Sequence, residues 1–301
     1  MTRDPGKRLP PSSNDSARTD ALNVAGTFFQ RKVAGEFRRS GWLVLAEEYP
    51  VTYPQSGPLS ERQSGAMDIW VINSAAFHGG SPAGSAFSSQ MECKKADPGF
   101  IDWVFFRKHG SNLRFRHLML YREDAATQHA LIVAEGNLHA LCDDGRELKG
   151  DYRGTDRTKS TSSRIQDAAR QAALATLSTA MTLRTAPQPP LNRFRIITLA
   201  PVVVTTANLF ICEFPLEDVQ QATGRLPPKS AEYLPQDYVV YDYPLTGGLA
   251  LAPGEVALSN RIPDDNIEVL VKMHVLIVNA GKGLDRLIDQ AHPLRVLIEG
   301  L

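Results

Sequence analysis

Hydrophobic residues recur at helical spacing near the start of the chain and then gather into three short runs. A helix is predicted over residues 20–40, with Asp20 as its N-cap and Gly41 ending it. Its apolar positions are Leu22, Ala25, Phe29, Val33 and Phe37. The three runs are short enough for strands, and they cover residues 42–53, 66–73 and 86–95.

The later part of the chain continues this mixture of elements. An Ala-rich helix is predicted over 164–183, between a hairpin and a series of β-branched runs. The hairpin is expected over 129–142, the strands over 194–206, 208–214, 238–243 and 268–280, and a terminal helix over 283–291. Segments 143–163 and 215–236 are polar and are expected to be flexible or loop-like. This order predicts an α/β protein with a mixed central sheet flanked by helices.

Composition sets the limits of this fold. The chain has 301 residues and 43% hydrophobic composition, enough for a sizeable core. Residues 1–19 are rich in Pro, Ser and charge, so we expect a disordered tail there. We expect residues 20–301 to form a single domain, with an insertion around 97–160.

Charge and cysteine usage narrow the function. The 33 basic and 33 acidic residues balance, which argues against a histone-like coating protein but permits a basic cleft in an enzyme. Three widely spaced cysteines indicate neither a disulfide framework nor a zinc knuckle. Without a signal sequence or a long apolar span, we expect a cytoplasmic protein that does not enter membranes.

Three charged residues on neighbouring predicted strands carry the candidate chemistry. Asp68 lies inside an apolar run, and Glu92 and Lys94 flank Cys93. Because side chains alternate along a strand, Glu92 and Lys94 point to one face and Cys93 and Lys95 to the other. Pairing of the two strands through the 78–85 loop would bring Asp68 beside Glu92.

Two neighbouring carboxylates in an apolar setting repel each other, and a divalent cation relieves this repulsion. Mg²⁺ or Mn²⁺ prefers such oxygen ligands and can activate water for attack on a phosphodiester, with a lysine nearby to help. The histidine spacing does not suggest zinc, and neither a phosphate-binding GxxxxGK[ST] loop nor a nucleophile elbow is present.

Asp68 followed by Glu92-x-Lys94 resembles the PD-(D/E)xK nuclease superfamily, whose members have a restriction-endonuclease-like core. The resemblance implies a metal-dependent nuclease with Asp68, Glu92 and Lys94 as catalytic residues. It implies that Glu36 on the first helix joins Asp68 and Glu92 in holding Mg²⁺ or Mn²⁺. It also suggests that Gln171, and less clearly Gln166, supports the site. The chain departs from the family pattern in having Met67, not proline, before Asp68.

Each of these residues also has a simpler interpretation. Asp68 could cap a turn, Glu92 and Lys94 could form an ion pair at a sheet edge, and Glu36 could pair with Arg39 or Lys32. The aromatic and basic segment 103–122 either binds nucleic acid or is a strand pair with its arginines in water. Its candidate contacts are Arg107, Lys108, Arg114 and Arg116.

We therefore expect a nuclease and favour DNA over RNA as its substrate, with the oligomeric state open and a homodimer among the options. The first alternative is a catalytically inactive module of the same fold that binds nucleic acid or a partner. The second is an unrelated α/β interaction protein.

Overall fold

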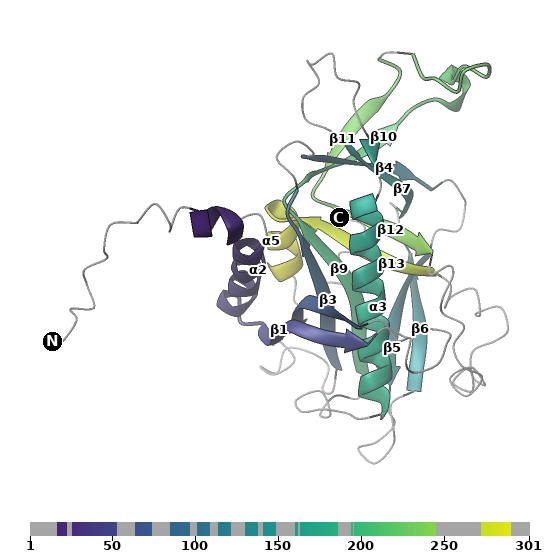
Figure 1. Ribbon diagram of the computed structural model, residues 1–301. Helices are drawn as coiled ribbons and strands as arrows, with labels where there is room; N and C mark the ends of the chain where they lie inside the picture. Colours follow the sequence, from purple (N-terminus) through teal and green to yellow (C-terminus); the bar gives the residue numbers. More distant parts are fainter. Residues whose placement is uncertain are drawn as a thin grey trace.

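The computed structural model describes most of the secondary structure of the chain (Figure 1). The described residues are 17–22, 26–52, 64–73, 85–96, 101–108, 114–121, 130–137, 141–148, 160–161, 163–185, 194, 196–227, 229–244 and 272–289. Among these residues, no helix is both long enough and apolar enough to cross a membrane.

One mixed β-sheet forms the centre of the protein, and ten strands follow one another across it. In spatial order they are β1 (Leu43–Thr52), β2 (Ser64–Ile72), β3 (Ser85–Lys94), β9 (Ile196–Thr205), β13 (Lys272–Asn279), β12 (Tyr238–Pro244), β7 (Leu141–Leu148), β4 (Asp102–Arg107), β10 (Asn208–Glu213) and β11 (Glu232–Gln236). The first three strands are antiparallel, and β3, β9 and β13 then run parallel.

Three further strands join this sheet away from the main path. β5 (Arg114–Tyr121) and β6 (Ala130–Asn137) form an antiparallel pair, and β5 also pairs with the first half of β9. The short β8 (Ser160–Thr161) pairs with the end of β7. The strands between residues 97 and 160 therefore belong to the same sheet as β1–β3.

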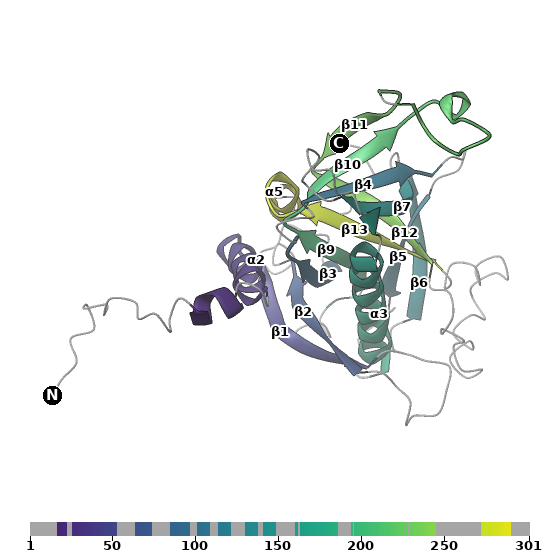
Figure 2. The same cartoon turned by 45° about the horizontal axis from the view of Figure 1, so that its top comes forward.

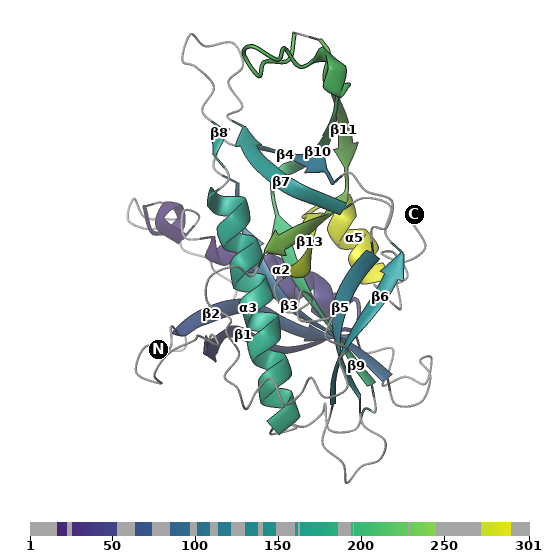
Figure 3. The ribbon, with the colours of Figure 1, turned by 90° about the vertical axis from the view of Figure 1, so that its right-hand side faces the viewer.

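Helices cover both faces of the sheet. The long helix α3 (Ser163–Thr185) packs on one face, where Ile165, Ala172 and Leu183 join the larger hydrophobic cluster. Helices α2 (Thr27–Arg39) and α5 (Lys282–Asp289) pack on the other face in a second cluster. Figures 2 and 3 show β3 and β9 between α3 on one side and α2 with α5 on the other.

The structure corrects two predicted elements near the N-terminus. The predicted helix over 20–40 is divided, because residues 17–22 are helical and α2 begins only after Gly26, whose φ of 78° is left-handed. Asp20 therefore lies inside a helical segment and does not cap α2. That segment begins within the predicted tail of residues 1–19, of which residues 1–16 lie outside the described residues.

The predicted hairpin over 129–142 is wrong. β6 pairs with the preceding β5, whereas β7 pairs with β4 and with β12. β7 also runs on to Leu148, into the segment expected to be flexible. The predicted 215–236 loop contains a short 3-10 helix (Leu216–Asp218) and β11, and with β10 it projects from the top of the molecule in Figure 1.

Candidate functional site

The register of the first three strands places Asp68 across from Glu92. The β2–β3 ladder pairs Ile69 with Met91, so one residue further along Asp68 faces Glu92. No ladder pair forms at that position among the described strands, and the side chain of Asp68 reaches across instead. Its Oδ2 accepts a hydrogen bond of 2.7 Å from the backbone N–H of Cys93. The two carboxylates thus lie on adjacent strands where the strands separate.

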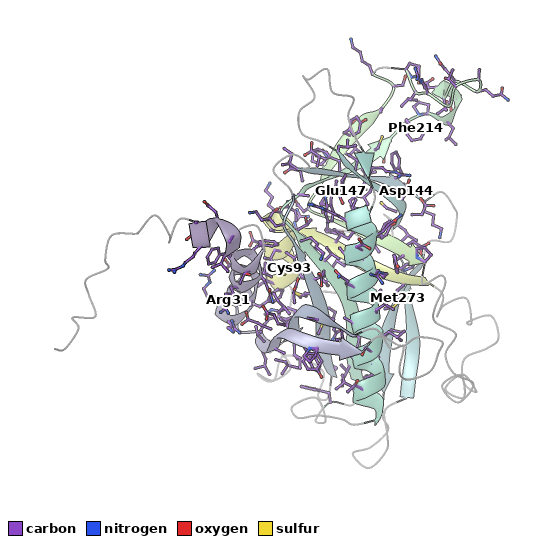
Figure 4. All side chains as sticks on the ribbon, viewed as in Figure 1. Arg31, Cys93, Asp144, Glu147, Phe214 and Met273 are labelled. Atoms are coloured by element: carbon purple, nitrogen blue, oxygen red, sulfur yellow. The ribbon has the colours of Figure 1, made fainter. Side chains whose placement is uncertain are left out.

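Lys94 completes this cluster on the face that α3 covers. Its Nζ lies 2.5 Å from Oε1 of Glu92 and donates a hydrogen bond of 2.9 Å to Oε1 of Gln171 on α3. Lys95, which strand alternation directs to the opposite face, is exposed. Cys93 packs against the hydrophobic cluster beneath α2, as the strand alternation predicts, and Figure 4 shows it at the centre of the molecule.

Burial makes the two carboxyl groups difficult to ionise. Glu92 is only 5% exposed, and its burial, together with the charge of Asp68, raises its pKa to about 7 although Lys94 opposes the shift. Burial also raises the pKa of Asp68, against the lowering effects of the Cys93 N–H and of Lys94. Both carboxyl groups therefore hold their protons more tightly than free carboxyl groups do, and Glu92 is only partly ionised at neutral pH.

A third acidic residue, Glu48 on β1, lies next to this pair and was not predicted. The β1–β2 register pairs Glu47 with Ile69 and Tyr49 with Met67, so Glu48 faces Asp68. Glu48 has a left-handed φ of 54°, uncommon for a residue other than glycine, and its charge adds to the rise in the Asp68 pKa. The sequence marks Glu48 as a charged strand residue but carries no signal for this backbone conformation.

Helix α2 reaches the site through Gln30 and not through Glu36. Gln30 donates a hydrogen bond of 2.8 Å from Nε2 to the backbone carbonyl of Asp68. The carboxylate of Glu36 pairs with Arg39, as in the simpler of its two interpretations, and its expected role as a metal ligand stays a prediction. Gln30 could have been noticed as a polar residue on the apolar face shared with Val33, Ala34 and Phe37.

The expected nucleic-acid contacts lie elsewhere. Arg107 pairs with Glu213 at 3.0 Å, and Lys108 pairs with the buried Asp242, so each charge has a nearby carboxylate. Arg114 and Arg116 lie on β5, and the structure does not describe their side chains. Gln166 forms its hydrogen bond with Tyr241, away from Lys94.

The cluster offers two carboxylates, one exposed acidic neighbour and one ammonium. Within the described residues, no group of three or more His, Cys, Asp or Glu side chains is arranged to hold a metal ion. Mg²⁺ commonly takes one or two protein carboxylates and completes its shell with water and phosphate, so Asp68 and Glu92 fit this donor pattern.

Comparisons with known proteins identified no relative of the chain. Searches against protein-family models, curated protein sequences and solved structures each found no match for the chain.

Proposed function

We propose that the protein is a metal-dependent nuclease that hydrolyses phosphodiester bonds, and we favour DNA over RNA as its substrate. The observation that carries this proposal is the convergence of Asp68, Glu92 and Lys94 from two adjacent strands, with Gln171 joining from α3. The order of α2, β1–β3, α3 and β9 supports a restriction-endonuclease-like core of the PD-(D/E)xK type, with β4–β8 as additional strands between β3 and α3.

Asp68 and Glu92 would hold Mg²⁺ or Mn²⁺, which when bound supplies Lewis-acid activation of water and charge neutralisation at the phosphate. The raised pKa values support this role, because a partly buried carboxylate pair gains from a cation that compensates its repulsion. Lys94 would orient or deprotonate the attacking water, or stabilise the charge that develops on the phosphate oxygens.

Gln171 contributes by fixing the direction of the Lys94 side chain. Lys94 is partly open, with its side chain 30% exposed, whereas Glu92 beneath it is buried. A substrate would therefore meet the ammonium before it reached the Glu92 carboxylate. This arrangement fits hydrolysis of a charged backbone better than passive binding, for which a partly buried carboxylate pair is unfavourable.

The test compares wild type with Lys94→Ala and Lys95→Ala on linear, supercoiled and single-stranded DNA and on RNA, with Mg²⁺ or Mn²⁺. Lys95→Ala is the matched control, because it removes the same charge one residue away on the opposite face. We expect cleavage by wild type and Lys95→Ala and none by Lys94→Ala. Equal cleavage by all three proteins would point to a contaminant or to a different site. Absence of cleavage by folded wild type would favour the inactive binding module.

A further inference from the structure

Asp68 lies at a gap in the hydrogen-bond ladders on both sides of its strand. In the described part of β1 and β2, the register pairs Met67 and Ile69 with residues of β1 but skips Asp68. On the other side, the β2–β3 ladder begins at Ile69 and runs to Ile72. The main chain at Asp68 therefore lacks the regular strand pairing that holds its neighbours.

Two hydrogen bonds from outside the ladders hold Asp68 instead. Its carboxylate accepts from the Cys93 N–H at 2.7 Å, and its carbonyl oxygen accepts from Gln30 Nε2 at 2.8 Å. Gln30 is 38 residues away in sequence and only 8% exposed. Water has little access to an amide buried in this way and cannot easily replace its partner. The contact therefore persists as long as α2 stays packed on the sheet.

We propose that Gln30 is a positioning residue that sets the Asp68 carboxylate for metal binding, an inference that rests on the proposed nuclease function. Without the Gln30 donor, the partly buried carbonyl oxygen of Asp68 loses this hydrogen bond, and an unsatisfied carbonyl in such a place costs free energy. The peptide then rotates towards another donor, and the carboxylate at the same residue moves with it. Small displacements matter, because residues that orient metal ligands commonly change metal affinity by about 10–100-fold when replaced.

Through Gln30, α2 contacts the site by an amide that bonds to the backbone of Asp68. Val33, Ala34 and Phe37 fix the helix against the sheet, and Gln30 extends the same buried face by one turn towards Asp68. The helix acts through the backbone of Asp68, whereas Glu36 points to Arg39.

The first measurement needs neither metal nor substrate. The chain has three cysteines, so ¹⁵N-cysteine labelling gives three backbone amide signals, from Cys93, Cys142 and Cys212. Single Cys→Ser variants at 142 and 212 assign these signals. Hydrogen exchange at Cys93 reports whether the Asp68 carboxylate still accepts its N–H, and the other two amides report global stability.

We expect Gln30→Met, which keeps the side-chain length without a donor, to speed exchange at Cys93 by about tenfold or more relative to Cys142 and Cys212. Gln30→Asn, one methylene shorter, should act in the same direction and serves if the methionine variant does not fold. Val33→Ala is the control, because it weakens the packing of α2 and leaves the Gln30 amide in place. Its effect should fall on melting temperature and not selectively on Cys93.

A second measurement is Mn²⁺ affinity by electron paramagnetic resonance of the free ion. Gln30→Met should weaken binding by about tenfold or more, and Val33→Ala should not. Unchanged Cys93 exchange in both Gln30 variants, or an equal response to Val33→Ala, would overturn the positioning role. Failure of wild type to bind Mn²⁺ would count against the proposed function itself, whatever the exchange result.

Discussion

Lys94 Nζ on β3 lies 2.9 Å from Oε1 of Gln171 on α3, so the long helix is tied directly to the candidate site. The neutral amide accepts from the ammonium without neutralising it. Glu92, on the other side of Lys94, supplies the charge partner at 2.5 Å. Lys94 is thus held in one direction by two acceptors of different kinds.

Replacing Gln171 by Leu should therefore reduce the cleavage rate without unfolding the protein. The Lys94 side chain loses one of its two acceptors and samples more rotamers, and we expect a decrease in kcat of about tenfold. Gln166→Leu, on the same helix but bonded to Tyr241, is the matched control and should keep normal kcat. If the two leucine variants cleave at the same rate, Gln171 has no role in the site.

The stability of the metal-free protein should fall as pH rises through the range in which Glu92 ionises. The folded pKa is about 7 and the ordinary value is 4.5, so the folded state binds this proton more tightly than the unfolded state. The stabilisation from the neutral carboxyl is full below about pH 4.5 and is lost by about pH 7, with a size of roughly 3 kcal/mol at most. Asp68, whose pKa is also raised, acts in the same direction.

Urea unfolding of wild type and Glu92→Gln in EDTA measures this effect. The amide cannot ionise, so the stability of the variant relative to wild type should increase between pH 5 and pH 8. A constant difference across that range would show that Glu92 ionises normally in the folded protein.

Glu48→Asn should lower the pKa of Asp68 and stabilise the protein slightly. The substitution removes the charge that raises the Asp68 pKa, and asparagine adopts the left-handed φ of 54° more readily than glutamate. We expect about 0.5–1 kcal/mol of added stability, part of the usual cost of a left-handed residue. Glu47→Gln is the control, because Glu47 pairs with Arg38. Carboxyl ¹³C titration of Asp68 checks the shift, and an unchanged pKa in Glu48→Asn would remove Glu48 from the site.

Two glycines in helices should respond oppositely to alanine. A Cβ at Gly283 of α5 would lie 2.0 Å from the carbonyl oxygen of Asp237, so Gly283→Ala should destabilise the fold by roughly 2 kcal/mol or more. A Cβ at Gly35 of α2 meets nothing within 4 Å, and Gly35→Ala should stabilise by about 0.5–1 kcal/mol. Melting temperatures of the two variants test the packing of α5, and a stable Gly283→Ala would contradict it.

The sequence allowed the central geometry to be predicted because strand alternation is a local rule. Glu92 and Lys94 share a face for that reason, and the placement of Asp68 across from Glu92 needed only adjacent antiparallel strands. Gln30 and Glu48 could not be placed in this way. The contact of Gln30 depends on how α2 lies against the sheet. The position of Glu48 depends on its left-handed backbone conformation in β1.

The same distinction explains the wrong hairpin. The segment 129–142 has the alternation of two strands, and a hairpin is the shortest way to pair them. β7 instead pairs with β12, whose residues lie about a hundred positions later in the chain. Such pairing is set by packing of the whole sheet, which a local hydrophobic pattern does not report.

The metal dependence of DNA cleavage tests the central claim most directly. Wild type should be inactive in EDTA and recover with Mg²⁺ or Mn²⁺, whereas Ca²⁺ should support binding better than cleavage. Asp68→Asn and Glu92→Gln should stay folded, since each removes one charge from a repelling pair, and should not cleave with any of these ions. Cleavage by wild type in EDTA, or undiminished cleavage by either carboxylate variant, would contradict the account.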